Sequence, residues 1–208
     1  MKQNYKILEN VITAQGNLVS LCGIASDINH TLVIGVVHGD EYQGEKLIYK
    51  YIDEFDKAGV LFIPCLNPDG RDLNTRTNSN GVDINRNFPT KNWELTEKDN
   101  YYGGSEPASE IETKFLVKII DKYKPKSIIT LHTPYKIVNF DGPAKDLAEM
   151  ISEIIKYPVE PSIGYPTPGS FGTYAGVERN IPTITLEMDE EETIENLYQP
   201  IKTIFNSL

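Results

Sequence analysis

The chain has 208 residues, of which 39% are hydrophobic and 24% charged, a composition ordinary for a soluble globular protein. Its formal net charge of −10 at pH 7 argues against nucleic acid or an anionic membrane surface as a partner. The N-terminal segment lacks the apolar core of a secretory signal, and no run approaches the roughly 18 apolar residues that span a bilayer. These features predict a cytoplasmic protein, and the length predicts a single domain over residues 1–208.

The predicted elements alternate between strands and helices. In chain order, the apolar patterns predict strands at 18–24 and 31–37, a helix at 43–56, a strand at 60–66, a helix at 106–123, strands at 127–131 and 137–140, a helix at 144–155, a loop at 158–172, a short helix at 173–179, a strand at 183–187 and a closing helix at 191–205. The run 31–37 is nearly all apolar, so we expect it near the middle of the sheet. The alternation predicts an α/β fold with a mixed, mostly parallel central sheet and helices on both faces.

Two of the three histidines follow runs that are expected to be strands. His38 comes directly after 31–37 and three residues before Glu41, and His132 comes directly after 127–131. In open α/β sheets the ligand crevice lies at the strand ends, so these side chains can converge there. Two imidazole nitrogens and a carboxylate oxygen are typical zinc ligands. The sequence therefore predicts a zinc site of the His₂Glu type, although a histidine at a strand end can also simply cap a backbone group.

A long polar segment, residues 71–102, shows little periodicity. Irregular stretches of this length inside a compact domain are more often functional than idle. The segment carries Arg76, Asn85 and Arg86, and arginine presents a planar, permanently charged fork that matches carboxylates and oxyanions. Composition alone leaves open a solvated loop whose arginines pair with surface carboxylates.

Glu187 is the last residue of the apolar run 183–187. A charge at the end of a buried strand is costly unless it has a role or a partner. A carboxylate in that position can accept a proton from water and return it to a departing amine. The alternative is an ordinary strand-end glutamate that precedes the acidic run 189–192.

Taken in order, five motifs resemble those of the zinc carboxypeptidase family, the M14 metallopeptidases. They are His38-Gly39-Asp40-Glu41, Asn67-Pro68-Asp69-Gly70, residues 76–89, His132 and Glu187. Residues 164–170 and 174–176 further resemble the small bacterial branch of the family that contains the murein peptide amidases. The resemblance extends from residue 30 to residue 190, which is most of the chain.

The resemblance implies a catalytic role for each matching residue. It implies that His38, Glu41 and His132 bind one Zn²⁺ per chain and leave one coordination position open. It also implies that Glu187 is the general base and acid, and that Arg76 stabilises the oxyanion.

On the substrate side, the resemblance implies that Asn85 and Arg86 hold a terminal carboxylate and that Asp83 orients one ligand histidine. Tyr165 matches the tyrosine that covers the substrate in this family, with Tyr174 as its rival.

The implied activity is hydrolysis of an amide bond beside a free carboxylate. The compact chain, in which we expect no pro-segment, and residues 165–170 favour the γ-D-glutamyl–meso-diaminopimelate bond, so the expected partner is a small murein-derived peptide. Diaminopimelate carries a second ammonium group, for which Asp141 and Glu178 are candidate partners. The alternatives are a general metallocarboxypeptidase, a deacylase of the aspartoacylase type and a non-catalytic binding module.

Overall fold

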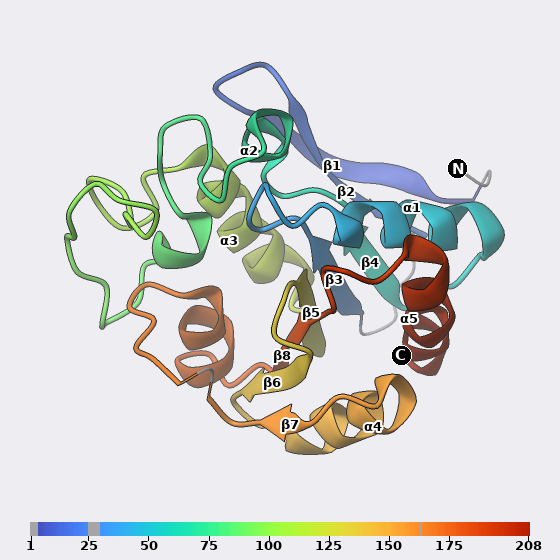
Figure 1. Ribbon diagram of the computed structural model, residues 1–208. Helices are drawn as coiled ribbons and strands as arrows, with labels where there is room; N and C mark the ends of the chain where they lie inside the picture. Colours follow the sequence, from blue (N-terminus) through green and yellow to red (C-terminus); the bar gives the residue numbers. More distant parts are fainter. Residues whose placement is uncertain (1–3, 25–29, 163) are drawn as a thin grey trace.

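The protein is represented by a computed structural model that describes residues 4–24, 30–162 and 164–208. Figure 1 shows its central sheet, whose strand order is β1-β2-β4-β3-β5-β8-β6-β7. A parallel block consists of β4 (Val60–Ile63), β3 (Thr31–Gly35), β5 (Ser127–His132) and β8 (Thr183–Glu187). Antiparallel pairing adds β2 (Leu18–Gly23) and β1 (Lys6–Ile12) at one side and β6 (Ile137–Asp141) at the other, where β6 pairs in parallel with β7 (Val159–Glu160). The predicted mixed, mostly parallel sheet is confirmed.

Helices cover both faces of the sheet, as predicted. One core cluster joins the sheet to α1 (Gln43–Glu54), α4 (Lys145–Ile155) and α5 (Ile194–Ser207), and a second joins it to α3 (Ile111–Tyr123). In Figure 1, α1 and α5 lie to the right of β3 and β5, and α3 lies to their left. Side chains alternate along a strand, so Val33 belongs to the first core and its neighbours Leu32 and Ile34 to the second. Among the described residues, no helix is long and apolar enough to cross a membrane.

Several predicted boundaries were wrong. The strand expected at 31–37 ends at Gly35, and the strand expected at 60–66 ends at Ile63. The helices expected to start at 106 and 191 begin at Ile111 and Ile194. The short helix expected at 173–179 is a π-helical turn, Thr173–Val177.

Four elements were not predicted at all, one of them the short 3-10 turn Ile84–Arg86. The other three are β1, the two-residue β7 inside the predicted loop 158–172, and α2 (Pro68–Leu73). Residue 163 of that predicted loop lies outside the described residues. The helix α2 begins at Pro68 because the Asn67 side chain accepts a hydrogen bond from Gly70 N at 2.9 Å, which satisfies one of the free N–H groups of the first turn.

Glu112, on α3, is a carboxyl group that the fold buries almost completely, with 1% of its surface exposed. Asn78 Nδ2 lies 3.4 Å from Glu112 Oε2 and donates a shorter bond, 2.8 Å, to Glu110. Burial raises the pKa of Glu112 to about 7, and the nearby Glu110 adds to the effect. The folded protein therefore holds a proton here at pH values where the unfolded chain, with its ordinary pKa of 4.5, has lost it.

We expect Glu112→Gln to stabilise the protein only at higher pH. Since the pKa of Glu112 is higher in the folded state, its contribution to stability is lost as pH rises from 4.5 to about 7. Glutamine keeps an acceptor for Asn78 without the charge, so urea unfolding should give little change near pH 4 and a gain of about 1–3 kcal/mol near pH 8. Glu153→Gln on the exposed side of α4 is the control and should give the same small change at both pH values. An equal effect of Glu112→Gln at both would contradict this assignment.

Candidate active site

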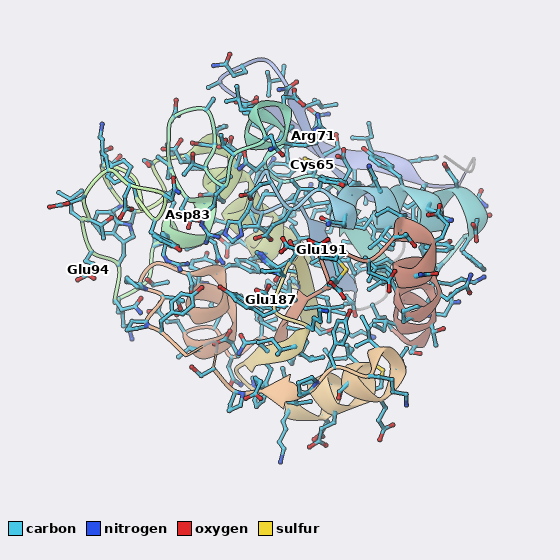
Figure 2. All side chains as sticks on the ribbon, viewed as in Figure 1. Cys65, Arg71, Asp83, Glu94, Glu187 and Glu191 are labelled. Atoms are coloured by element: carbon cyan, nitrogen blue, oxygen red, sulfur yellow. The ribbon has the colours of Figure 1, made fainter. Side chains whose placement is uncertain are left out.

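Three neighbouring parallel strands bring the predicted catalytic residues to one edge of the sheet. His132 is the last residue of β5 and Glu187 the last of β8, and the two are register partners. His38 follows the end of β3, the neighbour of β5 on its other side. The carboxyl ends of parallel strands meet at the same edge, so these side chains converge. Figure 2 shows Glu187 near the middle of the molecule, with Asp83 on the long loop to its left.

The turn after β3 directs His38 into this edge. Val36 has φ of 52°, a conformation rare for a β-branched residue, and it ends the strand. A Cβ built on Gly39 would lie 2.1 Å from the carbonyl carbon of Gly70, so only glycine lets these two motifs pack backbone against backbone. Gly39 N also donates to Arg76 O at 3.3 Å, which ties the His38 turn to the long polar loop.

The three predicted zinc ligands meet around one point. His38 Nδ1 lies 2.8 Å from Glu41 Oε1, and His132 Nδ1 lies 2.8 Å from Glu41 Oε2. One ligand atom from each of the three residues lies within 4.8 Å of the other two, and among the described residues this is the group that could hold a metal ion. Two buried imidazoles converging through their Nδ1 atoms on one carboxylate match the donor set of zinc, so the residues present fit that ion.

Burial and the neighbouring charges shift the pKa values of these three side chains. Burial alone would lower the pKa of His38, but the carboxylates of Glu41 and Asp83 outweigh it and raise that pKa to about 9. For His132 burial prevails and lowers the pKa. Burial would raise the pKa of Glu41, but the two histidines hold it well below its usual range. A metal binding here replaces the proton on His38, since histidine ligates in its neutral form.

Asp83 lies behind His38, on the side away from Glu41. Its Oδ1 lies 3.3 Å from His38 Nε2, an ion-pair contact outside hydrogen-bond geometry, and its Oδ2 accepts from Arg76 Nε and Nη2 at 2.9 Å each. Burial would raise the pKa of this fully buried carboxyl, but His38 and Arg76 hold it well below its usual range. Asp83 therefore holds both a predicted zinc ligand and the predicted oxyanion-binding arginine.

Glu187 is a buried carboxyl group beside the predicted metal ligands. Only 6% of its surface is exposed, and Oε2 has no hydrogen-bond partner among the described residues. Burial, and then the negative charge of Glu41, raise the pKa of Glu187 to about 8. This carboxyl group is therefore not committed to an internal ion pair.

Nearly all the predicted site residues line one cavity of about 370 Å³. Lining it are His38, Glu41, His132, Glu187, Arg76, Asn85, Arg86 and Tyr165. Arg86 is only 6% exposed, its Nη1 donates to Asn85 O at 2.8 Å, and no carboxylate within the described residues pairs with it. A buried guanidinium whose remaining donors face a cavity can bind a carboxylate that enters it.

The structure separates the two tyrosine candidates and the two acidic candidates. Tyr165 lines the cavity and is 42% exposed, whereas Tyr174 is 1% exposed and packs on Phe88 and Arg179 in the core. Asp141 also lines the cavity. Glu178 does not line the cavity, so naming it as a candidate was wrong; its Oε1 instead accepts from Lys91 N at 2.7 Å.

The model of the family described as zinc carboxypeptidase, Peptidase_M14, matches residues 13–146. This chain belongs to the zinc carboxypeptidase family. Murein peptide amidase A of Escherichia coli K12 is 36% identical over 135 residues, 59% of this chain and 55% of that protein, so the chain spans about half of that relative's length. Murein peptide amidase A of Vibrio campbellii is 37% identical over 176 residues, 76% of this chain and 68% of that protein.

Solved structures of zinc carboxypeptidases share the fold. Murein-tripeptide amidase MpaA from E. coli O157 superposes with a TM-score of 0.86 at 24% identity, over all of this chain and 92% of that one. Carboxypeptidase A from Helicoverpa armigera superposes with a TM-score of 0.74 at 15% identity, over 95% of this chain and 66% of that one.

Tyr101 and Asn139 are among the cavity residues that the sequence reasoning did not single out. Asn139 lies on β6, where strand alternation could have assigned it to the same face as Asp141. Tyr101 lies in the irregular loop, where no periodicity indicates which way a side chain points.

Proposed function

We propose that this chain is a zinc-dependent amidase that hydrolyses an amide bond beside a free carboxylate, and specifically the γ-D-glutamyl–meso-diaminopimelate bond of murein peptides. The observation that carries the proposal is the convergence, around one cavity, of the zinc ligand set, the uncommitted Glu187 carboxyl group and the arginines Arg76 and Arg86. The names of the two relatives from E. coli and V. campbellii support the murein substrate.

His38, Glu41 and His132 would hold one zinc ion per chain. When bound, zinc supplies a Lewis acid that polarises the scissile carbonyl and lowers the pKa of water towards about 7. Asp83 keeps the His38 ring fixed from behind, a kind of support that typically raises metal affinity and activity in such sites.

Glu187 takes a proton from the attacking water and delivers it to the departing amine. Its carboxyl group suits this role because Oε2 has no competing partner and lies in the same cavity as the zinc ligands. Arg76 donates to the oxyanion of the tetrahedral intermediate, and the Asp83 carboxylate fixes the orientation of its guanidinium through Nε and Nη2.

Arg86 and Asn85 bind the carboxylate beside the scissile amide, which fixes the bond that is presented for hydrolysis. The Asn85 side chain is itself held, since its Oδ1 accepts from Phe171 N at 2.9 Å and leaves the amide N–H₂ group for the substrate. Tyr165, half-exposed at the rim, covers the bound residue.

Asp141 favours diaminopimelate over an apolar C-terminal residue. Its carboxylate faces the cavity, burial raises its pKa, and no cation or hydrogen-bond donor within the described residues pairs with it. A Cβ on Gly172 would lie 2.1 Å from Asp141 Oδ2, so glycine leaves this carboxylate room. An apolar residue in the cavity would bury the carboxylate unpaired, whereas the second ammonium of diaminopimelate would pair with it.

The proposal is tested by metal content together with hydrolysis of L-Ala-γ-D-Glu-meso-diaminopimelate. We expect about one zinc per chain, loss of hydrolysis on chelation and its return when zinc is restored. Chelated protein with magnesium added is the matched control and should stay inactive, because three N and O ligands of this kind select zinc over magnesium.

Each other outcome removes a defined part of the proposal. Bound zinc with an intact tripeptide but cleavage of a blocked dipeptide would leave a general metallocarboxypeptidase. Cleavage of an N-acylated amino acid alone would favour a deacylase of the aspartoacylase type. Absence of bound metal even after zinc has been added back would reject a zinc-dependent hydrolysis altogether.

A further inference from the structure

Tyr101 lies against both arginines of the candidate site. The centroid of its ring is 5.1 Å from Arg76 Cζ and 5.8 Å from Arg86 Cζ. Both distances are within the range of about 6 Å in which a cation is attracted to the face of an aromatic ring. Tyr101 also lines the cavity, so its ring borders the space between the oxyanion-binding and carboxylate-binding groups.

The position of this ring is coupled to the rest of the site through the backbone. Asp83 N donates to Tyr102 O at 2.8 Å, and the Asp83 side chain holds Arg76. Tyr101 N in turn donates to Asp99 Oδ1 at 2.7 Å, which closes the local turn. Asp83 therefore holds both the backbone beside Tyr101 and the Arg76 guanidinium.

We propose that Tyr101 is a positioning residue that holds Arg76 and Arg86 for substrate without occupying their hydrogen-bond donors. A carboxylate partner would neutralise Arg86 and compete with the substrate carboxylate for the edge of its guanidinium. An aromatic ring contacts the guanidinium through its face, so the N–H groups at the edge stay available. This explains how Arg86 can be buried without a carboxylate partner within the described residues.

The catalytic part of this inference rests on the proposed amidase function, and the positioning part does not. Three variants separate the contributions of the ring. Tyr101→Phe keeps the aromatic face and removes the hydroxyl, Tyr101→Leu keeps apolar cover and removes the face, and Tyr42→Leu, at another exposed tyrosine that does not line the cavity, is the matched control.

The first readout is NMR of the two Arg Nε–H groups in the substrate-free, metal-loaded protein. We expect wild type and Tyr101→Phe to show the same ordered signals, and Tyr101→Leu to show loss of order at Arg86 above all, since Asp83 still holds Arg76. Unchanged order at both arginines in Tyr101→Leu would overturn the proposal. This readout needs no turnover, so it stands even if the chain proves not to be an amidase.

The second readout is hydrolysis of whichever peptide the wild-type protein cleaves. Each of the two contacts contributes about 2- to 5-fold, so Tyr101→Leu should lower kcat/KM by about 4- to 25-fold, with both a higher KM and a lower kcat. Tyr101→Phe and Tyr42→Leu should stay within about 2-fold of wild type. A loss in Tyr101→Phe equal to that in Tyr101→Leu would assign the effect to the hydroxyl and overturn the proposal.

Discussion

Replacing Glu187 with glutamine is expected to lower kcat on the murein tripeptide by about 10²- to 10⁴-fold, the usual contribution of a positioned general base. Glutamine has nearly the same shape but cannot accept the proton of the attacking water. Zinc content should be unchanged, because the three ligand atoms come from His38, Glu41 and His132. The measurement is single-turnover hydrolysis with metal analysis of the same samples.

Stability separates this prediction from simple misfolding. Glu187 Oε2 has no partner among the described residues, and burial disfavours its charge, so the glutamine variant should unfold at the same temperature as wild type or higher. Glu187→Asp keeps a carboxylate but withdraws it by one methylene, and we expect it to retain more activity than the glutamine variant. Full activity in Glu187→Gln would remove Glu187 from the mechanism.

The parallel core of the fold was predictable because burial on both faces leaves a plain signal in the sequence. All positions of β3 and β5 are buried, and their runs of apolar residues indicate central strands. The edge strand β1 has no fully buried position and mixes Lys, Glu and Asn with its apolar residues, so its pattern does not distinguish it from a loop. Its pairing with β2 is a tertiary contact that the local sequence pattern does not indicate.

Boundaries were wrong where side chains from distant segments replace helical hydrogen bonds. The helix expected from residue 106 begins only at Ile111, because the Asn87 side chain forms hydrogen bonds with the backbone of the preceding segment. Asn87 Nδ2 donates to Gly103 O and Glu106 O, and Glu110 N donates back to Asn87 Oδ1. Helical periodicity carries no information about such a partner, which lies far away in the sequence.

The candidate site was predictable where it is attached to strands and less so where it is attached to loops. His132 and Glu187 end neighbouring strands, and that placement follows from the pattern of apolar runs. Tyr101 reaches the arginines from an irregular loop, and Glu178, which follows the π-helical turn, is not among the residues that line the cavity. Both positions depend on backbone paths that have no period in the sequence.

Replacing Asp141 with asparagine is expected to abolish the preference between two substrates that differ by one ammonium group. The pair is L-Ala-γ-D-Glu-meso-diaminopimelate and the analogue that ends in 2-aminopimelate, which lacks the distal amine. Asparagine keeps the size of the side chain but removes the charge. A charge-assisted hydrogen bond contributes about 1.5–3 kcal/mol, so kcat/KM for the diaminopimelate substrate should fall by about 10- to 150-fold.

The same substitution should leave the 2-aminopimelate substrate unchanged or improve its hydrolysis. In wild type that analogue buries the Asp141 carboxylate without a cation, and asparagine relieves this cost. Glu178→Gln, the rejected candidate outside the cavity, is the matched control and should shift neither substrate. An equal loss on both substrates would mean that Asp141 only supports the wall of the cavity, and no loss on either would mean that the second ammonium is bound elsewhere. Neither result would change the roles proposed for the zinc ligands or Glu187. The ratio of kcat/KM between the two substrates depends only on the distal amine that distinguishes them.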